Sequence, residues 1–143
     1  MFNEIVIPVD GSEHAEKAAA RGFEIASQQN ANVHLICVAD TGPLSGYQLP
    51  GERESAEDAI TRQAASIISA VEEKAPSDVT VTTATPIGSA KSQIIKYADE
   101  VGADLIVMGS RGRDGVERLM LGSVTEHIVR VSDIDVLVHG GRD

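Results

Sequence analysis

The chain has 143 residues, of which 42% are hydrophobic and 24% charged, and these proportions are ordinary for a water-soluble globular domain. Its 22 acidic and 12 basic residues give a formal net charge of −10, which argues against a nucleic-acid partner, because phosphate backbones attract basic surfaces. No apolar run approaches the ~18 residues of a membrane span, so we expect no membrane partner. The amino terminus carries an acid where a secretory signal has positive charge. We therefore expect one cytoplasmic domain over 1–143.

The amino-terminal part of the chain alternates a short β-branched run with a longer amphipathic one. Residues 4–9 (EIVIPV) predict a strand, and in 13–29 apolar side chains recur at helical spacing. Residues 32–38 (NVHLICV) predict a second strand, in which we interpret Cys37 as a buried small hydrophobic residue. The long connection at 39–55 has no clear periodicity, and we expect either a partly ordered flap over a site or a solvated excursion.

The same alternation of apolar periods continues to the end of the chain. Runs rich in valine, isoleucine and threonine indicate strands, and longer stretches with apolar residues three or four positions apart indicate helices. The predicted elements are a helix at 55–74, a strand at 79–85, a helix from Ala90 to Val101, a strand at 104–109, a helix at 122–132 and a strand at 135–140.

These elements predict an α/β fold. Three of the strands, at 4–9, 104–109 and 135–140, are nearly continuous apolar runs, as expected when helices cover both faces of a sheet. Five strands joined by helices imply right-handed crossovers, so we expect a single doubly wound domain whose five-stranded parallel sheet has the order 3-2-1-4-5. Ligands bind such sheets beyond the carboxyl ends of the strands, here between the first and fourth strands.

Two loops would meet at that switch point. PVDGS at 8–12 offers the isolated carboxylate of Asp10, and MGSRGRDG after the fourth strand offers glycines and cations. Glycines let backbone amides approach an anion closely, and a helix N-terminus adds unsatisfied N–H groups. Three of the 12 basic residues lie within eight positions of this acidic chain, and they are Arg111, Arg113 and Arg118.

We interpret this local reversal of charge as an anion-binding site. The alternative is a plain connection between strand and helix, in which the glycines only turn the chain. In that case Ser123 and Glu126 would form an S-x-x-E capping box, which starts a helix without any ligand.

Several other classes of site lack their motifs. The glycine loop has no Lys and so is not a Walker A loop, and the turn DGSEHA after the first strand lacks the G-x-G-x-x-G dinucleotide fingerprint. A phospho-acceptor receiver domain would have an acid pair after the first strand and a Lys after the fifth, where this chain has VDGS and LVHGGRD. The four histidines lack metal-ligand spacing such as H-x-x-x-H, so we expect no metal held by the protein.

With these motifs the chain resembles the universal stress protein family, in its ATP-binding branch. The resemblance covers essentially the whole chain apart from the long connection, from IVIPVDGSEHAEKA near the amino terminus to DVLVHG at 135–140. Its most specific element is the spacing G-x2-G-x9-G-[ST], which is met by Gly109, Gly112, Gly122 and Ser123.

The resemblance implies ATP as the cofactor, with any Mg²⁺ held mainly by phosphate oxygens and water. Adenine and ribose contacts would come from the first two strands, and phosphate contacts from the loop and helix after the fourth. Asp10 would accept hydrogen bonds from the ribose hydroxyls, whereas the residues alone also allow it to cap the following helix with Ser12. The implied nucleotide-binding residues are Pro8, Val9, Asp10, Val38, Met108, Gly109, Arg111, Gly112, Gly122, Ser123, Val124 and Thr125.

The resemblance further implies a regulatory protein of the stress response that acts as a homodimer through its last strand, 135–140. No Gln, Glu or Lys stands in an evident catalytic frame with the arginines, so we expect ATP to be a ligand whose hydrolysis is slow or absent. One alternative is a slow ATPase or a self-phosphorylating protein with Ser123 or Thr125 as acceptor. Another is an interaction module without nucleotide binding, which the intact glycine spacing disfavours.

Overall fold

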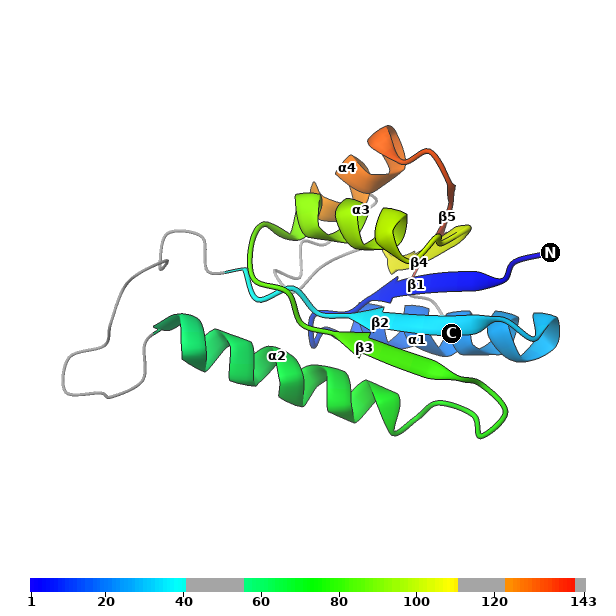
Figure 1. Ribbon diagram of the computed structural model, residues 1–143, viewed down its shortest axis with the longest axis horizontal. Helices are drawn as coiled ribbons and strands as arrows, with labels where there is room; N and C mark the ends of the chain where they lie inside the picture. Colours follow the sequence, from blue (N-terminus) through cyan, green and yellow to red (C-terminus); the bar gives the residue numbers. More distant parts are fainter. Residues whose placement is uncertain (41–55, 111–122, 141–143) are drawn as a thin grey trace.

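A computed structural model describes residues 1–40, 56–110 and 123–140, and Figure 1 shows these segments as strands and helices in alternation. The predictions that fall on 41–55 and 111–122 therefore lie outside the described residues. The elements are β1 (Glu4–Pro8), α1 (Glu13–Gln29), β2 (Asn32–Ile36), α2 (Ala56–Glu72), β3 (Val81–Ala84), α3 (Ala90–Glu100), β4 (Leu105–Gly109), α4 (Ser123–Val131) and β5 (Asp135–His139).

The strands form one parallel sheet in the order β3-β2-β1-β4-β5. This arrangement confirms the predicted α/β class and the order 3-2-1-4-5. In the register, Val6 of β1 pairs with His34 of β2 on one side and with Ile106 of β4 on the other. The carboxyl end of β1 therefore lies between those of β2 and β4, where a ligand site is expected.

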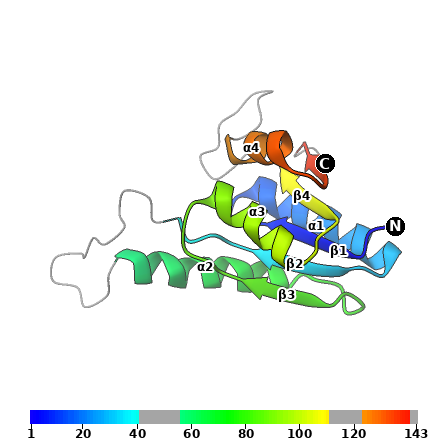
Figure 2. The same ribbon diagram turned by 45° about the horizontal axis from the view of Figure 1, so that its top comes forward.

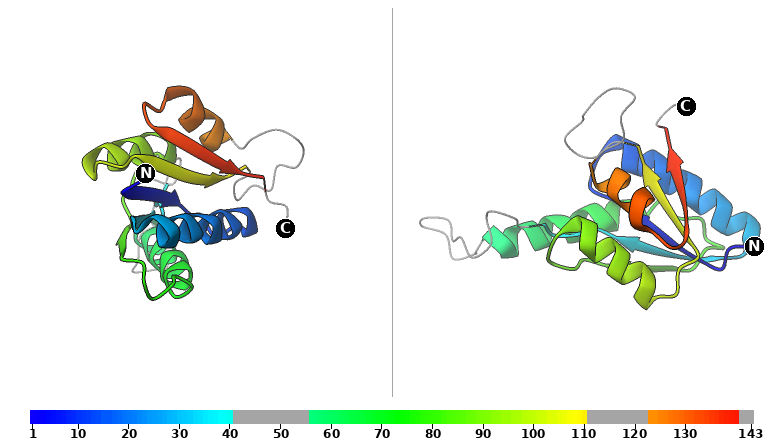
Figure 3. Two further views of the ribbon diagram at one scale, coloured as in Figure 1. Left: turned by 90° about the vertical axis from the view of Figure 1, so that its right-hand side faces the viewer. Right: turned by 90° about the horizontal axis from the view of Figure 1, so that it is seen from above.

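Two hydrophobic clusters fill the space between the sheet and the helices on its two faces. Because neighbouring side chains of a strand point to opposite faces, Ile5 and Ile7 of β1 pack into one cluster with α1 and α2, whereas Val6 packs into the other with α3 and α4. Figure 2 shows α3 and α4 together on one side, and the end view in Figure 3 shows helices on both faces of the sheet. Coverage on both faces explains the nearly continuous apolar runs of β1 and β4, whereas β5 lies at the sheet edge and has no fully buried residue.

The predicted strand at 32–38 is longer than the observed β2. Its last residues leave the ladder with β1 but continue to bond the segment after β3, because the amide of Cys37 donates to Ala84 O at 3.1 Å and that of Ala39 donates to Pro86 O at 2.8 Å. Residues 37–39 therefore pair with the segment after β3, and Cys37 and Val38 line a pocket beside the end of β1. None of the helices in the described part of the chain is both long and apolar enough to span a membrane.

Candidate functional site

A tight turn after β1 holds Asp10 at the carboxyl edge of the sheet. The amide of Ser12 donates to Asp10 Oδ1 at 2.9 Å, and Gly11 between them has a φ of +87°, a left-handed conformation that favours glycine. The side chain of Ser12 then caps α1, since Ser12 Oγ accepts from the amide of Ala15 at 3.1 Å. Ser12 is therefore the helix cap, and Asp10 stabilises the turn before it while remaining half-buried at the strand end.

The end of β4 packs directly against the first turn of α1. A Cβ added to Gly109 would lie 2.9 Å from the backbone oxygen of His14 and 3.0 Å from its carbonyl carbon, so a side chain does not fit here. Gly109 O also accepts a 2.8 Å hydrogen bond from Thr125 Oγ1, which joins the first turn of α4 to the same strand end. Three segments far apart in the sequence thus converge at Gly109.

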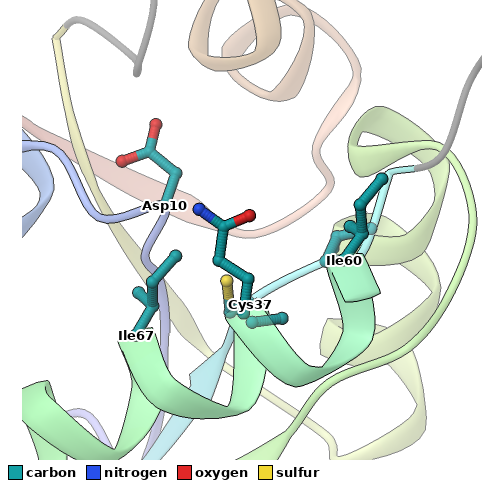
Figure 4. A pocket seen from close by; sticks show the side chains of 7 residues that line it. Asp10, Cys37, Ile60 and Ile67 are labelled. Carbon is teal, nitrogen blue, oxygen red and sulfur yellow. The ribbon is translucent and has the colours of Figure 1, made fainter. Parts of the chain in front are cut away.

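A small pocket lies beside Asp10, between the ends of β1 and β2 and the helix α2. Its volume is about 50 Å³. Figure 4 shows Asp10 and Ile60 toward opposite sides of the pocket, with Cys37 between them and Ile67 near Asp10. Pockets for small molecules measure roughly 300–1,000 Å³, so the described walls enclose only part of a nucleotide-sized space.

The structure brings some of the predicted site residues to this pocket. Asp10 and Val38 line it directly. Pro8 is the last residue of β1, and Val9, which is buried, joins β2 through a 2.9 Å bond from its amide to Ile36 O. These residues of the first two strand ends are therefore neighbours.

The other predicted residues that the structure describes belong to β4 and α4. Met108 is only 5% exposed and belongs to the hydrophobic cluster under α3 and α4, against which Val124 also packs. Ser123 is exposed at the start of α4, whereas Thr125 is 4% exposed and its hydroxyl is bonded to Gly109 O. Predicted contacts of Arg111, Gly112 and Gly122 lie outside the described residues.

Five residues that line the pocket were not among the predicted contacts. Four of them come from α2, and the apolar ones belong to the helical stripe that the sequence already predicts. The stripe has the spacing i, i+4, i+7, and Gln63 falls on the same face at i+3, which is the signal that could have identified it. The five are Cys37, Ile60, Gln63, Ala64 and Ile67.

A separate polar cluster lies at the opposite end of the sheet, where the strands begin. His34 Nε2 lies 2.7 Å from Glu4 Oε1, and the His34 ring meets Tyr97 of α3 edge-on at 6.1 Å between centroids. Burial raises the pKa of the Tyr97 hydroxyl, and the negative charge of Glu100 raises it further. Within the described ranges, no group of three or more His, Cys, Asp or Glu side chains is arranged to hold a metal ion.

Comparison with known proteins gives consistent matches over nearly the whole chain. The family model described as "Universal stress protein family" matches residues 1–139. Universal stress protein MJ0531 of Methanocaldococcus jannaschii is 33% identical over 139 residues, which are 96% of this chain and 82% of that protein.

Two solved structures are also similar to this chain over nearly its whole length. The hypothetical protein MJ0577 is 27% identical, with a TM-score of 0.82 over 96% of this chain and 95% of that one. A universal stress protein solved in complex with cAMP is also 27% identical, with a TM-score of 0.63 over 99% of this chain and 98% of that one.

Proposed function

The chain belongs to the universal stress protein family, and from this we propose that it is a regulatory protein that binds ATP or a related adenine nucleotide. The observation that carries the proposal is the pocket at the ends of β1 and β2, in which a single carboxylate, Asp10, stands beside apolar walls. A ribose offers hydroxyl donors to a carboxylate, and a base offers flat apolar faces to such walls. The relative of similar fold that was solved with cAMP supports an adenine ligand.

Asp10 is the proposed ribose anchor. The turn uses its Oδ1 to accept the amide of Ser12, and this bond fixes the direction of the carboxylate before any ligand arrives. Within the described residues the hydrogen bond at this carboxylate uses Oδ1 alone, which leaves Oδ2 for ribose hydroxyls. Pro8, Val9 and Val38 would then contact the nucleoside from the adjacent strand ends.

The proposed phosphate contacts lie on the other side of β1. Ser123 is exposed at the N-terminus of α4, where backbone N–H groups and the helix dipole favour an anion. Arg111, Gly112 and Gly122 remain proposed partners of the same phosphates. Thr125 has its hydroxyl bonded to Gly109 O, so we assign it the positioning of α4 rather than a phosphate contact.

ATP is proposed as a ligand whose hydrolysis is slow or absent. The hydroxyl of Thr125 is buried and bonded, which disfavours it as an acceptor of phosphate and leaves Ser123 as the exposed candidate. Incubation of labelled ATP with excess protein measures this directly. Stoichiometric ADP or phosphoprotein within minutes would contradict the proposal of a pure nucleotide binder and favour a slow ATPase or self-phosphorylating protein.

The proposed homodimer would form along β5, the edge strand of the sheet. His139 O accepts the amide of Ser110, the residue after β4, so the backbone groups of His139 and Leu137 point toward β4, while those of Val136 and Val138 point outward. Outward N–H and C=O groups on an edge strand are available to pair with a second chain. Val138→Pro removes one outward N–H and leaves the β4 ladder intact, so light scattering should then report a monomer.

Calorimetric titration with ATP, ADP, cAMP and adenosine tests the proposed ligand. Asp10→Ala should weaken ATP, ADP and adenosine by roughly tenfold, because all three carry free 2′- and 3′-hydroxyls on the ribose, and it should weaken cAMP less, because cAMP keeps only the 2′-hydroxyl. Asp99→Ala on α3 is the matched control, since it removes one exposed carboxylate far along the chain from the pocket. Failure of the parent protein to bind any of these compounds at millimolar concentration would overturn the proposal.

A further inference from the structure

The helix α2 presents a single amide to the pocket in an otherwise apolar face. Ile60, Gln63, Ala64 and Ile67 line the pocket, and their spacing places all four on one side of the helix. Three of them contribute only hydrocarbon. In ligand sites of this kind, a few polar groups among apolar walls set the orientation and specificity of the ligand.

The chemistry of Gln63 complements that of the other polar side chain in the pocket. The Asp10 carboxylate accepts hydrogen bonds only, whereas an amide donates through Nε2 and accepts through Oε1. Within residues 1–40, 56–110 and 123–140, the Gln63 side chain forms no hydrogen bond with another residue, and it is exposed. Its donor and acceptor are thus available to a ligand whose edge offers an acceptor beside a donor.

We propose that Gln63 is the residue that selects the base, by pairing with the N6 and N7 positions of adenine. This inference rests on the proposed nucleotide-binding function. With the ribose at Asp10, the base would extend toward Ile60 on the opposite side of the pocket (Figure 4), and Val38 is a further lining residue that it could contact. Gln63 lies on the same wall as Ile60, three residues further along α2, and therefore borders the edge of a base in that position.

The edge of the purine decides which nucleotide gains both bonds. Adenine has a donor at N6 and an acceptor at N7, which match Oε1 and Nε2 of a glutamine side chain. A 6-oxopurine has acceptors at both positions, so a planar amide can satisfy only one of them. Gln63 should therefore favour ATP over inosine triphosphate, although the two ligands share the ribose and all phosphates.

Calorimetric titration with ATP, inosine triphosphate and 7-deaza-ATP tests the pairing. The parent protein should bind ATP about tenfold more tightly than either analogue, because each analogue loses one bond. Gln63→Met has a similar length and no amide, so it should bind all three with dissociation constants within about twofold of one another. Gln28→Met, on the exposed face of α1, is the matched control and should keep the preferences of the parent.

A second variant separates the two bonds. Gln63→Glu keeps an acceptor for N6 but loses the donor to N7, so it should discriminate against inosine triphosphate and no longer against 7-deaza-ATP. If the parent and Gln63→Met show the same preferences, Gln63 does not read the base, and the proposed nucleotide binding stands. If the parent binds none of the three compounds, both this inference and the proposed function are overturned.

Discussion

Replacing Thr125 by valine tests whether its hydroxyl anchors α4 or contacts the nucleotide. Thr125 is 4% exposed, and its Oγ1 donates to Gly109 O at 2.8 Å. A valine methyl group in that place would lie roughly 0.5 Å inside the ~3.3 Å at which carbon and carbonyl oxygen make contact. The variant loses a hydrogen bond and leaves a buried carbonyl with one donor fewer, so we expect a loss of about 2 kcal/mol in the free energy of unfolding.

Urea unfolding followed by circular dichroism, without nucleotide, measures this loss. In a thermal melt of this chain of 143 residues, the same 2 kcal/mol corresponds to a decrease in Tm of about 7 °C. Thr125→Ser is the matched control, because it keeps the donor and loses only one buried methyl group, at a cost of about 1 kcal/mol. If Thr125→Val were as stable as the parent, or if it weakened ATP binding while adenosine binding stayed the same, the hydroxyl would contact phosphate and our assignment would be wrong.

Three further changes test the packing around the site. Gly109→Ala should cost about 1–3 kcal/mol in the same urea assay, because its Cβ would lie 2.9 Å from the His14 oxygen, and an unchanged stability would show that α1 and β4 are not held in this contact. Gly11→Ala should cost about 1–2 kcal/mol, because Gly11 has a φ of +87°. Gly102→Ala is the control, since Gly102 has a φ of +67° and open space around it. It measures the backbone effect without the contact that a Gly11 side chain would make with Ile67. Burial and the charge of Glu100 raise the pKa of Tyr97 in the folded protein, so the unfolded chain releases this proton at a lower pH than the folded one. Above pH 10 the parent should therefore lose stability relative to Tyr97→Phe. Equal pH profiles of the two proteins would contradict the expected shift.

Short-range patterns in the sequence predicted the elements and their order. Apolar residues at period two or 3.6 predict strands and helices because the two backbones place side chains with those repeats. The alternation of the two predicts a parallel doubly wound sheet, since a right-handed helical crossover joins neighbouring parallel strands. The observed order β3-β2-β1-β4-β5 confirms that prediction. The turn at Asp10 and Ser12 was also recognisable, since its bonds join residues two or three positions apart.

The long-range contacts of the site could not be predicted in this way. The sequence showed Thr125 as an available hydroxyl, whereas packing places it against the carbonyl of Gly109, sixteen residues earlier. Gly109 fitted a phosphate-loop spacing, but its neighbour in space is the first turn of α1, which belongs to a different part of the chain. A sequence pattern shows which polar side chains are present, but it does not show which of them form hydrogen bonds with distant residues in the fold.

The sequence by itself determined the fold class, the family and the position of a lone carboxylate at a strand end. These depend on local periodicity and on glycine and turn residues, which act within a few positions of themselves. The tertiary structure decided which face of α2 meets Asp10, and thereby brought Gln63 into the pocket as a candidate base reader. That placement depends on how α2 packs against β2, because the crossover brings together residues that are more than twenty positions apart.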